Sequence, residues 1–442
     1  MAEKLGLREV VAMGVGGIIG GGIFVVLGVA ANLAGHAAFL TYLLAGLIAL
    51  ASGHSYVQLT SRFEEDGGSF TFLEHYVSNI KIAGVVGWIL IVGYIGTMAM
   101  YAYAFGAFTA NLVGLGSITV VRPLISVGVI GVFVAVNWLG VRETGGSEDI
   151  LVYSKVAILS LFVAVGIAGI LTRPDLHFLS GGVFPRDAFS PIVAIGAIFV
   201  SFEGFQLLTY EYSDIQGGIS VLRKGIIGSI VLSTLIYVLV AFVTTSLVTP
   251  EQIVQHEETI LAFAATKIFS GGVLNQVFFV LISVAALFST ASAINATLFG
   301  TARLGHKVAS ERVLPTLFSF KNKKGIPAKS LLLIGALTAL FTFFGTLQAI
   351  TTFASISFIL IFGVVNLLAF KERDSWLQAA VAGFGIIGTT SALCLLLWHL
   401  YTEQTVMLAF IAAVFIIVIL LELFYFERDL LIEKAHEVEE EL

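Results

Sequence analysis

The sequence predicts an all-α membrane protein with twelve transmembrane helices. Of its 442 residues, 58% are hydrophobic and only 12% are charged, and the mean hydropathy is +1.00. A soluble protein of this length carries about 25% charged residues. Apolar runs of roughly the 20 residues needed to cross a bilayer fill almost the whole chain. These observations exclude a soluble protein and indicate a chain that crosses the membrane many times.

The candidate transmembrane helices are twelve apolar runs joined by short polar connections. They comprise residues 9–33, 38–60, 84–113, 122–141, 150–171, 190–211, 225–248, 273–302, 329–346, 350–370, 376–398 and 404–426. The first run lacks a small-residue cleavage site and is followed by many others, so we expect a helix there and not a cleaved signal peptide. The single cysteine, Cys394, excludes an intrachain disulfide.

Polar stretches between the spans predict structure outside the bilayer. Residues 61–82 are expected to form a re-entrant or surface segment. Residues 249–271 begin with Thr249-Pro250-Glu251, which is typical of a capped helix start. The most basic connection is residues 303–329, and the charged residues 427–442 are expected to form a cytoplasmic tail.

Lysine and arginine residues predict the orientation of the chain. With twelve spans, both termini lie on the same side of the membrane. If that side is the cytoplasm, 18 Lys and Arg residues lie inside and four lie outside, and Lys155 remains within the fifth span. Membrane proteins carry an excess of Lys and Arg in their cytoplasmic connections. We therefore expect a plasma-membrane protein with cytoplasmic N- and C-termini.

Two spans are interrupted at corresponding positions. The first contains a glycine-rich run, residues 14–22 ("GVGGIIGGG"), and the sixth contains "SFEGF", residues 201–205. Broken helices at matching places in two halves predict an inverted repeat with a binding site between the breaks. The five-plus-five halves are residues 9–171 and 190–370, and two further helices follow in residues 376–426.

The glycine-rich run has three interpretations. A dinucleotide-binding turn needs Gly-x-Gly-x-x-Gly after a strand, whereas Gly14, Gly16 and Gly20 have a different spacing and no strand precedes them. Close helix packing explains glycines four residues apart. An unwound helix best explains the three consecutive glycines Gly20–Gly22, since glycine is about 1 kcal/mol worse than alanine in a helix. Irregular backbone at membrane depth is tolerated where it lines a cavity.

The two breaks offer complementary chemistry. Exposed N–H groups in the first span, at the positive end of the half-helix that follows, suit a carboxylate. Carbonyl groups freed at residues 200–203 would accept hydrogen bonds from an ammonium group. One site with both features fits an α-amino acid, and Phe202 or Phe205 is expected to close over it.

At these residues the sequence resembles the amino acid–polyamine–organocation (APC) superfamily of transporters, and within it the prokaryotic proton-coupled broad-specificity amino acid transporters. The resemblance extends from residue 7 to about residue 426. It is carried by "GVGGIIGGGIF" (14–24), "FVSFEGFQLLTYE" (199–211), "LFSTASAINATLFGTAR" (287–303) and "AFKERD" (369–374).

The resemblance implies the residues of a substrate site and of a proton site. The substrate-binding residues would be Ile18, Ile19, Gly20, Gly21, Gly22, Val200, Ser201, Phe202, Glu203 and Gly204. The first span would bind the carboxylate, and main-chain carbonyls of the sixth would bind the amino group. Lys155 would couple transport to protons, with Gly16 and Ser289 as neighbours. Gly21 stands where relatives commonly carry serine, threonine or alanine, which is expected to enlarge or soften the floor of the site.

Ionisable residues within the spans have competing interpretations. A lysine at the centre of a membrane helix costs about 2.5–3.5 kcal/mol, which favours a function for Lys155, although its amine could instead reach the interface. Glu203 would be a second proton acceptor or a contact to a cationic substrate. Alternatively, its carboxylate is held by nearby backbone N–H groups or points to the cytoplasmic vestibule. His54 is expected to be a core histidine.

The sequence therefore predicts proton-coupled uptake of α-amino acids by alternating access. Alternatives with the same fold are an amino acid exchanger and a polyamine or amine transporter. A channel or receptor is the alternative from a different class. An enzyme is not expected, because no nucleophile–base pair is visible, and we expect no metal site, cofactor or nucleic-acid partner. The expected partners are the amino acid, the proton and the lipid bilayer.

Overall fold

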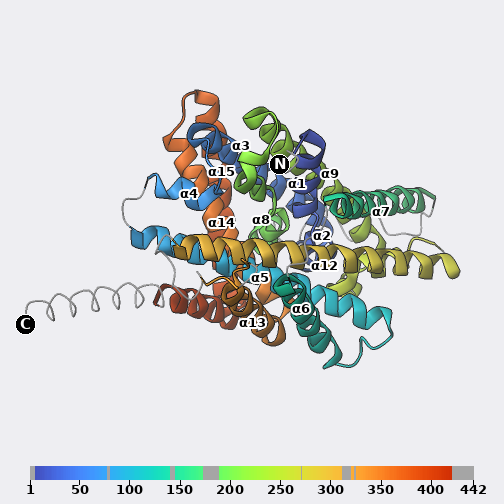
Figure 1. The fold of residues 1–442 in the computed structure, drawn as a ribbon. Coiled ribbons are helices and arrows are strands. Elements are labelled where there is room, and N and C mark those ends of the chain that lie inside the picture. Colours follow the sequence, from blue (N-terminus) through green and yellow to red (C-terminus); the bar gives the residue numbers. More distant parts are fainter. Residues whose placement is uncertain are drawn as a thin grey trace, which may run out of the picture.

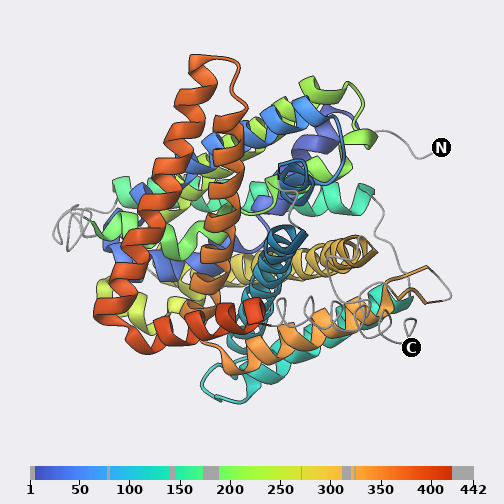
Figure 2. The ribbon, with the colours of Figure 1, turned by 90° about the vertical axis from the view of Figure 1, so that its left-hand side faces the viewer.

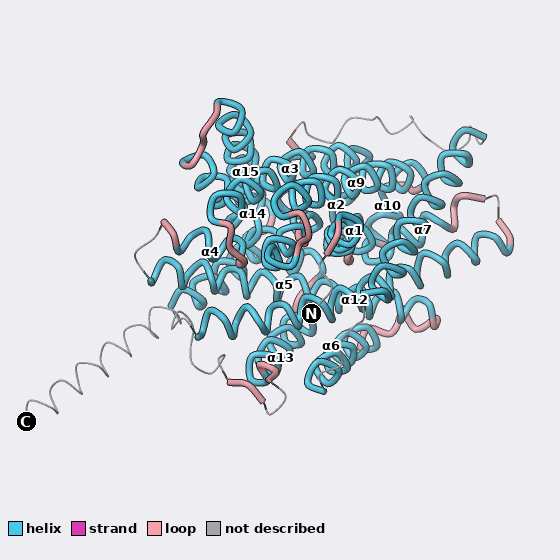
Figure 3. The backbone as a smooth tube through the Cα atoms, turned by 45° about the horizontal axis from the view of Figure 1, so that its top comes forward, coloured by secondary structure: helices cyan, strands magenta, loops and turns pink. Residues whose placement is uncertain are grey.

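A computed structural model of the protein describes residues 5–76, 80–139, 145–172, 189–269, 271–310, 320–322 and 325–420. All regular elements within these ranges are helices, and Figure 3 shows helices and loops in this part of the chain. Leu5 and Ile215 form an isolated parallel bridge. The predicted all-α fold class is therefore confirmed.

The helices follow the predicted apolar runs along the chain. They are α1 (Leu7–Ile18), α2 (Gly22–Ala34), η1 (Gly35–Ala37), α3 (Ala38–Phe63), α4 (Gly68–Glu74), α5 (Ile80–Leu112), α6 (Val121–Leu139), α7 (Gly145–Thr172), α8 (Ser190–Ile198), η2 (Phe199–Phe202), η3 (Phe205–Asp214), α9 (Gly218–Leu247), α10 (Pro250–Gln255), η4 (Glu257–Thr259), α11 (Ile260–Ala265), α12 (Val273–Ser310), α13 (Ala328–Phe344), α14 (Leu347–Lys371), α15 (Trp376–Glu403) and a helix over Thr405–Leu420. Within the described ranges, nine helical stretches are long and apolar enough to cross a membrane. The chain is a multi-pass membrane protein.

The first predicted span consists of two helices. α1 ends at Ile18 and α2 begins at Gly22, and Gly21 between them has φ −145° and ψ −10°. The break thus coincides with the three consecutive glycines, as the unwound-helix interpretation predicts. Close packing is a second reason for the run, because a Cβ atom on Gly17 would lie 3.1 Å from the carbonyl oxygen of Gly204.

The sixth predicted span is interrupted as well. α8 ends at Ile198, the 3-10 helix η2 ends at Phe202, and a second 3-10 helix, η3, begins at Phe205. Between them Glu203 is extended, with φ −69° and ψ 146°, and Gly204 has φ 125°. Glycine alone adopts this positive φ without steric cost, so Gly204 allows the chain to turn at the break.

The interrupted sixth span lies in the core of the bundle. The most apolar part of Ser190–Asp214 is 89% buried, against 22% for α6, so α8, η2 and η3 lie inside and α6 lies at the periphery. The long helix α12 crosses the middle of the molecule beside α5 (Figure 1). α14 and α15 lie side by side and are joined by a short loop at the top of the view in Figure 2.

Several helices are longer than the apolar runs that predicted them. α9 begins at Gly218 instead of residue 225, and α12 continues to Ser310 instead of ending at residue 302. Apolar composition marks the part of a helix that lies in lipid, whereas backbone hydrogen bonding continues through polar residues beyond it. The predicted capped helix after Thr249 is confirmed as α10, with a complete capping box. The predicted tail, residues 427–442, lies outside the described residues.

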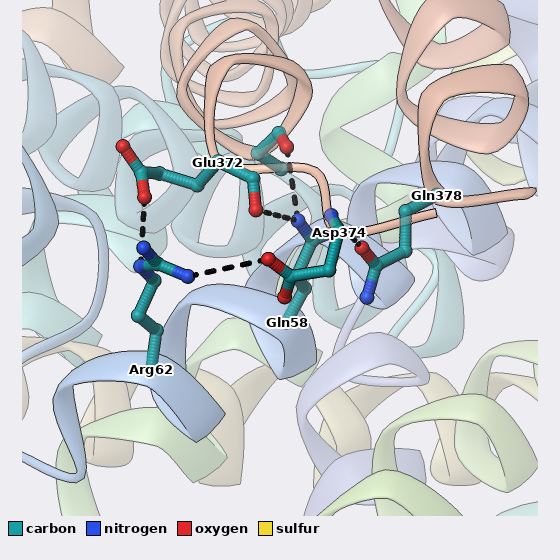
Figure 4. A network of polar contacts seen from close by, with 6 residues as sticks. Gln58, Arg62, Glu372, Asp374 and Gln378 are labelled. Atoms are coloured by element: carbon teal, nitrogen blue, oxygen red, sulfur yellow. Dashed lines mark hydrogen bonds and ion pairs between the residues drawn. The ribbon is translucent and has the colours of Figure 1, made fainter. Parts of the chain in front are cut away.

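A polar network joins the C-terminal ends of α3 and α14 (Figure 4). Arg62 Nε lies 2.7 Å from Glu372 Oε2, and Gln58 Nε2 donates to the carbonyls of Ala369 and Glu372 at 2.9 and 3.1 Å. This network borders a cavity of about 200 Å³ that His54 also lines. His54 is partly exposed there, so its expected place in the core is wrong: it lies near the polar end of α3.

Candidate substrate site

The carbonyl groups at the end of α1 are held by side chains from two other helices, α9 and α12. Tyr237 of α9 donates to the Ile18 carbonyl at 2.7 Å. Ser289 of α12 donates to the Ile19 carbonyl at 2.9 Å and also to the carbonyl of Gly20. Carbonyls at a helix end have no partner within the helix, and these side chains supply one. The break is therefore fixed by tertiary contacts.

Lys155 of α7 contacts the same break. It is only 4% exposed, and its Nζ donates to the Ile19 carbonyl at 3.3 Å and to Ser292 Oγ at 3.4 Å. The amine is buried beside the break, which excludes the interfacial alternative in this conformation. The predicted neighbour Ser289 shares the Ile19 carbonyl with Lys155. The backbone group that Lys155 contacts is the carbonyl of Ile19, which lies three residues after the predicted neighbour Gly16.

The N-terminus of α2 presents backbone N–H groups at the break. The first N–H groups of any α-helix lack partners within the helix, and no side chain caps the N-terminal residue Gly21. α2 has 13 residues, long enough for its dipole to place partial positive charge at this end. The arrangement can stabilise a small anion such as a carboxylate.

The two breaks are in direct contact. A Cβ atom on Gly22 would lie 2.8 Å from Ser201 Cα and 3.1 Å from the Ser201 carbonyl oxygen. Real Cβ atoms do not approach a backbone this closely without displacing it, so a residue without a side chain is required. The structure thus brings together both groups of predicted substrate residues, Ile18–Gly22 and Val200–Gly204, and all of them are buried.

Hydrogen bonds also fix the second break. The Val200 N–H donates to Ser355 Oγ of α14 at 3.1 Å, and the Ser355 hydroxyl donates to the Ala197 carbonyl at 2.8 Å. The Val200 carbonyl accepts from the Glu203 N–H at 3.1 Å. Ser355 therefore replaces backbone contacts that a continuous α-helix would make here.

Aromatic side chains enclose the breaks. The ring of Phe202 packs 5.5 Å from Tyr237 and 6.4 Å from Tyr42, measured between centroids. Tyr101 of α5 lies against the first break: a Cβ atom on Gly21 would be 2.6 Å from Tyr101 Cε1. The prediction that Gly21 enlarges the floor of the site is therefore wrong, because Tyr101 occupies the space that a side chain would take.

Sequence reasoning missed four residues that shape this site: Tyr101, Gln206, Tyr237 and Ser355. Tyr237 and Ser355 lie in spans with no other unusual feature, and the span periodicity gives no reason to select them. Gln206 carried a weak signal, since it is a polar residue one helical turn after Glu203 in an apolar span.

A multi-pass bundle in which two interrupted helices meet in the core is the architecture of a secondary transporter. The chain belongs to the amino acid permease family, whose model matches residues 5–429. It is therefore an APC superfamily transporter and not an enzyme, and its function class is amino acid transport.

Relatives support this assignment. The chain is 28% identical over 404 residues to the inner membrane transport protein YbaT of Escherichia coli, and the match covers 90% of each chain. It is 24% identical over 400 residues to the branched-chain amino acid permease BcaP of Bacillus subtilis, covering 85% of this chain and 82% of that one. A crystal structure of the Eremococcus coleocola manganese transporter, 12% identical, shares the fold with a TM-score of 0.60 over 95% of both chains.

Proposed function

We propose that this protein takes up α-amino acids together with protons by alternating access. The observation that carries the proposal is the buried amine of Lys155 on the Ile19 carbonyl, within the break of the first span. A protonated amine there makes a charge-assisted hydrogen bond, roughly twice as strong as a neutral one. Protonation of Lys155 would thus stabilise the break in its substrate-binding shape.

The substrate would bind between the two breaks. Its carboxylate would lie at the N-terminus of α2, against the N–H groups at residues 20–22, where no side chain competes. Its ammonium group would bind main-chain carbonyls in the segment 200–203, at the negative end of α8. Phe202 and its aromatic neighbours would close over the side chain.

The proposed cycle alternates between two states of Lys155. In the outward-open state the amine takes a proton, braces α7 against the break and favours substrate binding. Opening toward the cytoplasm admits water, the amine releases its proton, and the brace weakens. Ser289 also donates to this carbonyl in the structure, so the loss of the Lys155 bond alone would loosen the break without unfolding it.

The remaining parts of the proposal concern the whole chain. It would cross the plasma membrane twelve times with both termini in the cytoplasm. Residues 9–171 and 190–370 would form the inverted repeat, with the two interrupted spans at equivalent positions. The supporting observations are the two breaks, five spans apart, and the asymmetry of Lys and Arg between the two sides.

Uptake into proteoliposomes tests the proposal. Purified protein is reconstituted into vesicles without internal amino acid, and a panel of labelled amino acids is offered with and without an inward proton gradient. The proposal expects accumulation that rises with outside acidity and is indifferent to sodium. Uptake that needs sodium would refute proton coupling. Uptake that needs a preloaded internal amino acid would identify an exchanger instead.

A further inference from the structure

Glu203 places a buried carboxyl group at the second break. Its side chain is 2% exposed, and its described hydrogen bond comes from Gln206 Nε2 at 3.3 Å. Among the ion pairs of the described residues, none involves Glu203. An ionised carboxylate buried without a cation carries a penalty of several kcal/mol. In this conformation the group is therefore best accommodated as a neutral carboxylic acid.

Gln206 holds this carboxyl group in place without supplying charge. Its Oε1 accepts a hydrogen bond from the Gly204 N–H at 2.8 Å, which fixes the orientation of the amide. The Nε2 group then donates to Glu203 and, at 3.4 Å, to the hydroxyl of Tyr94. An amide N–H group can donate to a carboxylate and also to the carbonyl oxygen of a carboxylic acid. The position of Glu203 is thus compatible with both protonation states.

In the part of the chain that the structure describes, the titratable groups that interact electrostatically with Glu203 are tyrosines. They are Tyr56 from α3, Tyr94 and Tyr101 from α5, Tyr210 from η3 and Tyr237 from α9. Tyrosine is neutral near physiological pH, because its ordinary pKa is about 10. The described contacts of Lys155 are with the other break. Glu203 therefore exchanges its proton with water or hydroxyl groups and not with a fixed counter-ion.

A row of hydroxyl groups leads away from Glu203. Beyond Gln206 and Tyr94, the hydroxyl of Tyr210 lies near those of Tyr94 and Ser69 without a hydrogen bond to either. Ser69 belongs to α4, which begins a few residues after Glu64 and Glu65, the exposed residues that follow α3. The row thus extends from the break toward the end of the molecule where α3 terminates, which is the cytoplasmic end in the proposed orientation.

We propose that Glu203 is a second proton-exchanging group of the transport cycle, in addition to Lys155. This inference rests on the proposed function. While the breaks are in contact, the carboxyl group carries a proton. When the breaks separate and water enters from the cytoplasm, the acid ionises and the proton leaves. Each turnover then moves two protons with one amino acid, one bound by the lysine amine and one by the carboxylate.

The test measures the ratio of protons to amino acid in proteoliposomes, from the membrane potential that just balances a known substrate gradient at a fixed pH difference. Glu203→Gln keeps the oxygen that accepts from Gln206 and removes the exchangeable proton. We expect a ratio of two in the wild type and one in Glu203→Gln, a twofold fall. Glu211→Gln, on the same segment, is the control and should keep the wild-type ratio.

The other outcomes distinguish the role of Glu203 from the proposed function. A wild-type ratio of one, or an active Glu203→Gln protein with an unchanged ratio, overturns the inference and leaves the proposed function intact. If Glu203→Gln does not accumulate substrate, exchange of labelled substrate at equal pH is measured. Retained exchange supports a role in proton exchange, whereas loss of exchange and of substrate binding overturns it. A wild type without any proton coupling refutes the proposed function itself.

Discussion

At the scale of single residues, the carbonyl of Ile19 is the point where two side chains from other helices hold the first break. It accepts hydrogen bonds from Lys155 of α7 and from Ser289 of α12. A buried carbonyl must find a partner, and here one of its two donors can change its charge. In the proposed cycle, a change in protonation at Lys155 would act directly on the backbone that would bind the substrate.

Gly22 is predicted to tolerate no side chain. A Cβ atom at this position would lie 2.8 Å from the Cα atom of Ser201, so Gly22→Ala forces the two breaks apart. Overpacking of this kind costs about 1–3 kcal/mol. We expect substrate affinity to fall by roughly 10- to 100-fold in a binding assay on purified protein. Gly300→Ala, where a Cβ atom would meet open space, is the control. Equal affinity of Gly22→Ala and wild type would show that the substrate does not bind where Gly22 contacts Ser201.

Tyr237 is predicted to stabilise the break through its hydroxyl. Tyr237→Phe keeps the ring that packs on Phe202 and leaves the Ile18 carbonyl without its donor. An unsatisfied buried acceptor costs about 1–3 kcal/mol, so we expect a lower thermal unfolding temperature and slower uptake. Tyr401→Phe is the control, because Tyr401 is 63% exposed near the end of α15. Similar losses in both variants would contradict this role.

At the scale of elements, the two polar contacts between α3 and α14 are expected to contribute unequally to stability. Arg62 is 48% exposed, and an exposed ion pair contributes at most about 1 kcal/mol. Gln58 is 9% exposed and satisfies two carbonyls at the end of α14. We therefore expect Gln58→Leu to lower the thermal unfolding temperature more than Arg62→Ala does. The reverse order would show that the ion pair holds these helices together.

The 3-10 helix η4 is predicted to dock on α2 in a pH-dependent manner. The Glu257 carbonyl lies against Gly28 of α2. Burial of Glu257, and secondarily the charge of Glu258, raise the pKa of the Glu257 carboxyl, while a hydrogen bond from Asn32 lowers it. A raised pKa in an acid favours the protonated form. The docked state is thus most stable at low pH and weakens as the pH rises through that raised pKa.

Hydrogen–deuterium exchange, corrected for intrinsic rates, tests this dependence over residues 256–265. We expect protection to decrease as the pH rises in the wild type, and the decrease to disappear in Glu257→Gln. Glu251→Gln, in the exposed first turn of α10, should behave as the wild type. A pH dependence that survives in Glu257→Gln would assign the effect to another group.

The predicted elements agree with the structure where a local sequence signal determines them. Apolar runs located the helices, and the consecutive glycines Gly20–Gly22 located the first break. The contacts that hold the breaks, such as Tyr237 with Ile18 and Ser355 with Ala197, join residues more than 150 positions apart. No local pattern encodes such pairs. The filling of the space beside Gly21 by Tyr101 is equally a property of packing, so the sequence suggested a void there.

At the scale of the whole molecule, the account describes a transporter in which both breaks are in contact and the buried amine braces one of them. Substrate and protons would enter when these breaks separate on one side of the membrane. The family assignment establishes amino acid transport as the function class. The central claim beyond it is that the charge of Lys155 drives accumulation.

The most direct test compares Lys155→Ala with the wild type in proteoliposomes under an inward proton gradient. The control is Lys329→Ala, because Lys329 contacts the ring of Phe320, away from both breaks. The account predicts that wild type and control concentrate amino acid against its gradient. It predicts that Lys155→Ala only equilibrates substrate and retains measurable binding. Concentrative, proton-driven uptake by Lys155→Ala would contradict the account.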